Sequence, residues 1–178
     1  GQCNVGNWKD IIAISAGESF TIGLRSDGTV VATGSNSFKQ CNVADWTDIV
    51  AISAGTSHTV GLRSDGTVVA AGEDYDDACN VRSWKNIVAV SAGLSHTVGL
   101  KSDGTVVAVG VESFDDGQCN VSDWKDIIAV SAGAGYTMGL RSDGTVVAVG
   151  NNQNGRSDVN DWKDIVAISA GMYSSIGL

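Results

Sequence analysis

Proline is absent from this chain of 178 residues, although glycine occurs 23 times. Turn-rich chains normally use both residues, so Gly, Asp, Asn and Ser must make the turns here. Long apolar runs are absent too, and none approaches the roughly 20 residues that cross a bilayer, which excludes a transmembrane helix. The chain begins without Met and without a basic-then-apolar signal segment, so we expect a processed or trimmed piece.

Basic residues are scarce. Eleven Lys and Arg face twenty Asp and Glu, which gives a net charge of −9. Nucleic-acid binding replaces counterions on phosphate with Lys and Arg, and anionic membranes attract the same side chains. We therefore expect neither nucleic acid nor a membrane surface as a partner. At 43% hydrophobic residues the chain is still globular, and we treat residues 1–178 as one domain.

The motifs of common enzymes and metal sites are missing as well. The sequence contains no nucleophile elbow, P-loop or dinucleotide-binding fingerprint. Asp74 and Asp76 alternate as calcium ligands do, but no loop completes the pattern with a bidentate Glu. The cysteines are too far apart in sequence for a zinc cluster. We expect no enzyme, no catalytic residue, no metal site and no cofactor.

A repeat dominates what is present. Self-similarity with a period of about 20–50 residues is the signature of repeat architectures. The seven letters SDGTVVA begin at Ser26, Ser64, Ser102 and Ser142. Tryptophan recurs every 38 or 40 residues, at Trp8, Trp46, Trp84, Trp124 and Trp162. We divide the chain into four whole repeats and a partial fifth, at about 1–38, 39–76, 77–116, 117–154 and 155–178.

Within one repeat the pattern is that of short β-strands. We expect strands at 11–16, 21–24 and 29–33, because these runs are β-branched or apolar and too short to prefer helix. Asp27-Gly28 lies between the last two runs, and such a pair favours a type I′ hairpin turn. The equivalent turn glycines are Gly66, Gly104 and Gly144.

A type I′ turn at this place sets the register of the hairpin, with Leu24 opposite Val31 and Gly23 opposite Ala32. One face of the sheet is then apolar, and the other is small enough for a neighbouring sheet to approach closely. A small sheet with two buried faces needs copies of itself on both sides. We therefore predict an all-β protein built of β-propeller blades, in preference to a β-solenoid, whose coils usually run about 20–29 residues.

The repeat resembles that of the regulator of chromosome condensation family. Ser-Ala-Gly-x-x-His-Thr-Val-x-Leu occurs at 53–62 and 91–100, and Asp-Gly-Thr-Val-Val-Ala-x-Gly follows the first copy of this region at 27–34. The connector at 38–43 is similar to compact bacterial members. The resemblance covers essentially the whole chain and implies a β-propeller, most often of seven blades. The signature histidine is present only as His58 and His96, and Phe20, Tyr136 and Ser174 replace it elsewhere.

Three residue types are expected to belong to the framework, because each recurs at one place in the repeat. The tryptophans are expected to open the first strand of each repeat, and His58 and His96 to occupy a packing position or make a local hydrogen bond. Cys3, Cys41, Cys79 and Cys119 are also equivalent. Packed sheets lie about 10 Å apart, whereas a disulfide needs Cα atoms within about 7 Å. We expect unpaired, half-buried thiols, which favour a reducing cytoplasm or an anaerobic extracellular setting.

Acidic residues are concentrated in two consecutive connectors, the segments that follow the last strands of the second and third repeats. Connectors of neighbouring blades emerge on one face, so we expect an acidic patch with aromatic anchors, which is typical of a protein-binding surface. Ordinary solvated loops are the alternative. The candidate residues are Glu73, Asp74, Tyr75, Asp76, Asp77, Glu112, Phe114, Asp115 and Asp116.

The fifth repeat stops at Leu178, before its last strand, which would leave an apolar sheet face at each end of the array. We expect the chain either to be cut from a longer ring or to form a homo-oligomer in which another copy completes the ring. The function that we favour is a non-enzymatic scaffold that binds a protein partner of basic character through its connectors. The family includes nucleotide exchangers, chromatin binders and a secreted β-lactamase inhibitor. The resemblance therefore leaves two alternatives: guanine-nucleotide exchange on a small GTPase and inhibition of a secreted enzyme.

Overall fold

The computed structural model describes residues 1–74, 77–110 and 116–178, and these residues form an all-β structure. Four antiparallel three-stranded sheets follow one another along the chain, and a two-stranded sheet comes last. The strands are β1 (Ile11–Ala16), β2 (Phe20–Arg25), β3 (Val30–Gly34), β4 (Ile49–Ala54), β5 (His58–Arg63), β6 (Val68–Gly72), β7 (Ile87–Ala92), β8 (His96–Lys101), β9 (Val106–Gly110), β10 (Ile127–Ala132), β11 (Tyr136–Arg141), β12 (Val146–Gly150), β13 (Ile168–Ala170) and β14 (Ser175–Gly177). The predicted fold class is confirmed. No helix of the described residues is long and apolar enough to cross a lipid bilayer.

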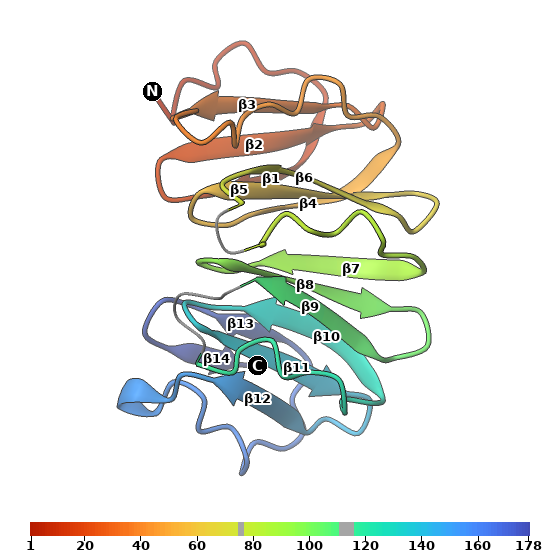
Figure 1. Cartoon of the computed structure of the whole chain (residues 1–178), viewed down its shortest axis with the longest axis vertical. Helices are drawn as coiled ribbons and strands as arrows, with labels where there is room; N and C mark the ends of the chain where they lie inside the picture. The colour runs from red at the N-terminus through yellow and green to blue at the C-terminus, as the bar shows by residue number, and fades with distance from the viewer. Residues whose placement is uncertain (75–76, 111–115) are drawn as a thin grey trace.

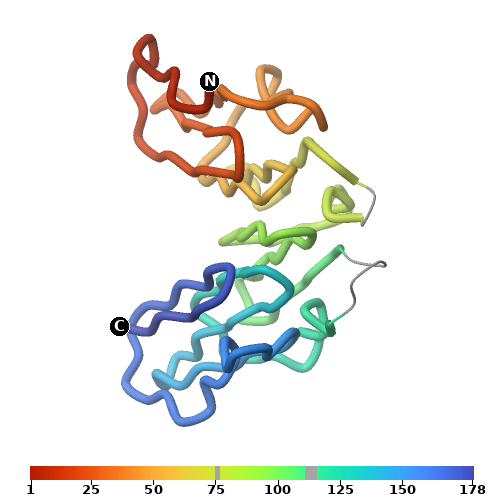
Figure 2. The backbone as a smooth tube through the Cα atoms, turned by 90° about the vertical axis from the view of Figure 1, so that its left-hand side faces the viewer, coloured from red at the N-terminus to blue at the C-terminus, as the bar shows by residue number. Residues whose placement is uncertain are grey.

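The sheets stack face to face in chain order (Figure 1). The first strands β1, β4, β7 and β10 each contact the first strand of the following sheet. The second strands β2, β5, β8 and β11 also contact the first strand of the following sheet. The sheets therefore converge at their first strands, and the stack bends into an open arc with the first and fifth sheets at its two ends (Figure 2). This is how β-propeller blades are arranged about an axis.

The hairpin register differs from the prediction by one residue. In the first sheet Leu24 pairs with Val30 and Gly23 pairs with Val31. The other three complete sheets repeat this pairing. The predicted pairing of Leu24 with Val31 is therefore wrong, and with it the face assigned to Val31. The loop is longer than a two-residue turn, so each later residue moves to the opposite face.

The loop itself explains the shift. The Arg25 amide donates to the Thr29 carbonyl at 2.9 Å, and the Gly28 amide donates to the Arg25 carbonyl at 3.0 Å. Gly28 alone has a left-handed φ, of 79°, as in a three-residue loop closed by a bulge. The Asp27 carboxylate accepts hydrogen bonds from the Thr29 hydroxyl at 2.7 Å and the Thr29 amide at 2.9 Å. These two bonds hold the loop and lower the pKa of Asp27. The predicted type I′ turn is wrong because Thr29 closes the loop instead of extending the strand.

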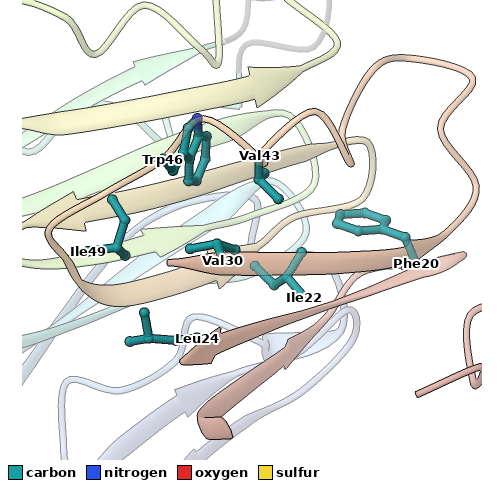
Figure 3. Packing of buried hydrophobic residues seen from close by; sticks show 7 residues of the cluster. All are labelled: Phe20, Ile22, Leu24, Val30, Val43, Trp46 and Ile49. Atoms are coloured by element: carbon teal, nitrogen blue, oxygen red, sulfur yellow. The ribbon is translucent and has the colours of Figure 1, made fainter. Parts of the chain in front are cut away.

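The core is a set of layers between neighbouring sheets. Each layer joins the apolar face of one sheet to side chains of the next repeat, which come from the turn ahead of its first strand and from the start of that strand. The first layer contains Phe20, Ile22, Leu24, Val30, Val43, Trp46 and Ile49 (Figure 3). Phe20 to Val30 belong to the first sheet, and Val43 to Ile49 belong to the second repeat. Similar layers follow between the later sheets. Each repeat is thus stabilised by burial against the repeat before it.

The tryptophans lie in the turn ahead of the first strand and not in the strand, which corrects the predicted position. Trp46 is only 8% exposed. A Cβ atom on Gly61 would lie 2.7 Å from Cζ3 of the Trp46 ring. The ring is therefore held between Gly61 of its own sheet and the first sheet. Glycine at this position makes room for a tryptophan of the same repeat, whereas we expected it to admit a neighbouring sheet.

The two ends of the arc present apolar side chains that have no following or preceding sheet. At the first sheet Ile14 is 71% exposed, and at the fifth sheet Ile176 is 65% exposed. The equivalent residue of Ile14 in the second repeat, Ile52, is packed against the first layer. The equivalent of Ile176, Val60, is fully buried.

Candidate binding surface

The Ser-Ala-Gly motif joins neighbouring sheets at the ends of their first strands. Ser15 Oγ accepts a hydrogen bond from the Ala54 amide of the next sheet at 3.0 Å. The same bond recurs at 2.9 Å from Ala92 to Ser53, from Ala132 to Ser91 and from Ala170 to Ser131. The serine of the motif therefore connects one sheet to the next.

The glycine of the motif admits a ring side chain. A Cβ atom on Gly17 would lie 2.1 Å from a ring carbon of Phe20 and 2.6 Å from the Gly55 carbonyl oxygen. Gly55 stands in the same relation to His58, with 2.5 Å to its Cε1. No side chain fits at this position, so the turn brings backbone up to the ring. The residue after the glycine is the first one in the turn whose side chain is free to face outward.

His58 and His96 lie below these turns and are buried. Thr97 Oγ1 donates its proton to the Ala78 carbonyl at 2.7 Å, so His58 Nε2 must donate to Thr97 Oγ1, which lies 3.0 Å away. His96 makes the same contact with Thr137 at 3.0 Å. Nε2 therefore carries a proton in each ring, and each ring links its own sheet to the next. Burial lowers the pKa of both histidines to about 4, so both rings are neutral at pH 7.

The connectors begin beside the same turns. The Ser35 amide donates to the Ser19 carbonyl at 2.8 Å, and the Glu73 amide donates to the Ser57 carbonyl at 3.0 Å. The Asn151 amide donates likewise to Gly135 at 2.8 Å. These bonds place the Ser-Ala-Gly turns and the starts of the connectors on one face of the arc. We call it the connector face: its described residues are 16–19, 34–40, 54–57, 72–74, 77–78, 92–95, 116–118, 132–135, 150–156 and 170–173.

A pocket of about 320 Å³ lies among the Ser-Ala-Gly turns, where the first strands converge. All five repeats contribute to its wall. Most of the wall is the Ala and Gly of the motif, and one variable residue follows in each repeat: Glu18, Thr56, Leu94, Ala134 and Met172. Leu94 is 40% exposed and Met172 is 53% exposed, so apolar side chains face solvent here.

The charge of the connector face is mainly negative. Its one exposed basic residue in the described part of the chain is Lys39, because Arg156 is buried with its guanidinium 5.7 Å from the centre of the Tyr136 ring. Its acidic residues are Glu18, Glu73, Asp74, Asp77 and Asp116. A field of one sign on such a face favours partners of the opposite sign.

The described residues include only part of the predicted acidic patch. Asp74 Oδ1 accepts the Cys79 amide at 2.9 Å, and Asp116 Oδ2 accepts from Asn151 Nδ2 at 2.9 Å. The Asp74 carboxylate therefore holds its own connector together, and the Asp116 carboxylate links its connector to the one that follows β12. Glu73 and Asp77 belong to the same connector as Asp74. Tyr75, Asp76, Glu112, Phe114 and Asp115 lie outside the described residues.

Three of the cysteines follow the connectors as half-buried thiols. Cys41 Sγ donates to the Ser35 carbonyl at 3.2 Å, and Cys79 Sγ donates to the Glu73 carbonyl at 3.4 Å. Cys119 Sγ contacts the Gly110 carbonyl at 3.6 Å, one repeat position before the acceptors of the other two thiols. Burial, with the nearby Asp74 carboxylate, raises the pKa of Cys79 to about 12. The Cys79 thiol therefore closes the connector and is a poor nucleophile at neutral pH.

One exposed apolar feature was missed in the sequence. Each complete sheet has a register shift near the start of its first strand, as between Ile11 and Ala13. The extra residue of this bulge points away from the layers. These residues, with the equivalent in the fifth repeat, are Ile12, Val50, Val88, Ile128 and Val166, and they are 53–74% exposed. Their apolar character suggested burial, and no local signal in the sequence marks a bulge.

Comparison with known proteins agrees with this geometry. The sequence profile of the regulator of chromosome condensation (RCC1) repeat matches residues 11–40, 49–77, 87–118 and 127–156. The chain belongs to the RCC1 repeat family. Each match runs from the first strand of a sheet to the end of its connector. No curated protein matches the chain significantly.

Solved structures similar to this RCC1-repeat chain share its fold. Yeast RCC1 (Prp20) in complex with Kap60 has a TM-score of 0.77 at 16% identity, over 94% of this chain and 54% of that one. Prp20p from Saccharomyces cerevisiae, reported with its binding properties to Gsp1p and histones, has a TM-score of 0.76 at 17% identity, with coverage of 94% and 56%. The ectodomain of the Arabidopsis thaliana receptor kinase ACR4 has a TM-score of 0.75 at 24% identity, with coverage of 95% and 66%. The chain thus spans about half the length of the two yeast chains.

Proposed function

We propose that this RCC1-repeat chain is a non-catalytic scaffold that binds another protein through its connector face. The observation that carries the proposal is the contrast within the repeat. Residues that join the sheets recur, whereas the residues that reach solvent on this face differ from repeat to repeat. They combine an apolar pocket with an excess of acidic side chains. Apolar area within a charged surround is typical of protein-binding surfaces.

The partner that suits this face has a basic surface. The acidic connectors at 73–77 and 112–116 are part of the proposed surface, with Tyr75 and Phe114 as its aromatic anchors. Complementary charge speeds association and makes it depend on salt. Binding through this face requires no reaction, which agrees with the proposed role as a scaffold.

Charge reversal on the connector face tests this function. Glu18→Lys combined with Glu73→Lys changes the face without removing the carboxylates that hold the connectors. The matched control is Asp45→Lys with Asp123→Lys, which makes the same change in charge in the exposed turns ahead of Trp46 and Trp124. Proteins captured from a lysate by the wild type and by the control, but lost with the first variant, would support the proposal. Equal capture by all three would remove the connector face from consideration.

Nucleotide exchange on a small GTPase is a second candidate, suggested by the similarity to yeast RCC1. That similarity is one of fold. Release of a fluorescent guanine nucleotide from small GTPases, with and without the chain, separates the two functions. Accelerated nucleotide release would favour the exchange function, and unchanged release from all the GTPases tested would favour the scaffold function.

We also propose that two copies of this chain associate through the ends of the arc. Ile14 and Ile176 are exposed there, although their equivalents pack between sheets. A first sheet of one copy on a fifth sheet of another would reproduce that packing. Light scattering should give a mass above that of one chain at micromolar concentration, and the mass of a single chain would contradict the association.

A further inference from the structure

The pocket of the connector face is mostly apolar and has one charged residue in its wall. Ala and Gly of the five turns form most of the surface, with Leu94 and Met172 projecting from two of them. The charged residue is Glu18. The volume of the pocket, about 320 Å³, lies at the lower end of the range of ligand pockets, about 300–1,000 Å³. An apolar side chain that enters such a pocket leaves water and gains free energy.

The variable position of the pocket wall is not needed for the fold. Its five residues, Glu18, Thr56, Leu94, Ala134 and Met172, differ in size and charge. The Ser, Ala and Gly before them recur in all five repeats, and contacts between sheets account for the Ser and the Gly. Residues that packing does not dictate are available for recognition, and here they all face one cavity.

The surroundings of the pocket add a second requirement. The connectors beside it carry Glu73, Asp74, Asp77 and Asp116, and Glu18 lies in the wall itself. Asp74 remains an acceptor toward its own connector, and Asp116 toward Asn151 of the next connector. A segment that crosses the pocket therefore lies on a face where, among the described residues, Lys39 is the one exposed basic residue beside several carboxylates. Lysine or arginine on either side of the entering side chain would complement these charges.

We propose that the pocket receives one large apolar side chain, Leu, Met or Phe, from an exposed segment of a protein partner in which Lys or Arg flanks that residue. The inference rests on the proposed function and specifies the chemistry of the partner. The apolar side chain supplies affinity through burial. The flanking charges supply orientation and rate of association.

The probe is the peptide acetyl-Lys-Lys-Leu-Lys-Lys-amide, titrated to millimolar concentration against the chain with labelled Leu and Met methyl groups. NMR signals of Leu94 and Met172 report binding at the pocket. We expect the Leu peptide to bind roughly tenfold more tightly than the same peptide with Ala at its centre, because part of the Leu side chain leaves water. A peptide with Glu in place of Lys should bind most weakly.

A pair of variants separates the pocket from the rest of the face. Ala134→Phe fills the cavity at a position where each repeat has a different residue, and it should abolish the preference for Leu. Ser122→Phe adds the same ring to another exposed and variable position, ahead of Trp124, and should leave binding unchanged.

Two results would overturn the inference. No binding of the Leu peptide at millimolar concentration would exclude this class of occupant. Equal binding of the Leu and Ala peptides, or a Leu preference that persists in Ala134→Phe, would exclude the pocket. If that binding is then lost in Glu18→Lys with Glu73→Lys, the connector face still binds basic partners and only the pocket is refuted.

Discussion

Replacing both buried histidines with phenylalanine should remove most of the acid sensitivity of the fold. Burial lowers the pKa of His58 and His96 to about 4. His58 lowers the pKa of His96 further, whereas the Asp74 carboxylate partly opposes the effect of burial on His58. In the unfolded chain their pKa is about 6.5. Below pH 6.5 the unfolded chain binds protons that the folded chain does not, so acid favours unfolding. Their full contribution is therefore present above about pH 6.5 and is lost as the pH falls toward 4.

The magnitude follows from the two pKa values. Each histidine should reduce the free energy of unfolding by about 2 kcal/mol between pH 7 and pH 5, and the pair by about 4 kcal/mol. The double variant His58→Phe with His96→Phe uses a ring that the first repeat already holds at this position, as Phe20 beside Gly17. The hydroxyls of Thr97 and Thr137 keep their carbonyl acceptors, so no donor is left without a partner.

Urea unfolding at pH 7, 6 and 5, followed by tryptophan fluorescence, measures the effect. The variant should lose far less stability than the wild type over this interval, whatever its stability at pH 7. The carboxylates of Asp27 and its equivalents are present in both proteins, so their titration cancels in the comparison. An equal loss in the two proteins would refute the assignment of the buried, neutral histidines.

Four further substitutions test the contacts between sheets, each by urea unfolding at pH 7. Trp46→Ala should cost about 3–5 kcal/mol because the ring is buried between two sheets, and Trp8→Ala should cost clearly less because no sheet precedes it; equal losses would contradict the layered core. Gly61→Ala should destabilise by about 1–3 kcal/mol, since the added Cβ meets the Trp46 ring at 2.7 Å, and a neutral effect would mean that the ring is not held there. Ser53→Ala should cost about 1–3 kcal/mol by leaving the Ala92 amide without an acceptor, and no change would rule out the serine as the connection between sheets.

Much of the fold follows from local pattern. The runs at 11–16, 21–24 and 29–33 are close to the observed strands β1, β2 and β3, because short β-branched runs between turn residues have few alternatives. The repeat itself predicts stacked sheets, since a single small sheet cannot bury both faces. The register was not predictable in the same way. An Asp-Gly pair is compatible with two loops, and the hydrogen bonds from Thr29 to Asp27 decide between them.

The candidate surface was less accessible to sequence reasoning. The acidic connectors stand out by composition alone, and the structure places Glu73, Asp74, Asp77 and Asp116 on the connector face. The pocket could not be predicted, because its wall is assembled from residues about 38 positions apart that resemble ordinary turn residues. Glu18, Leu94 and Met172 become neighbours of one cavity only when the first strands converge.

The order of residues by itself determined the repeating strands, the turn glycines and the excess of negative charge, because these depend on backbone preference and ionisation within a few residues. Tertiary structure decided where each side chain lies and what it contacts. Trp46 lies over Gly61 and against the preceding sheet, Ile12 projects from a bulge, and five separate turns enclose one pocket. The reason is that these outcomes depend on packing between repeats, which the sequence of a single repeat does not contain.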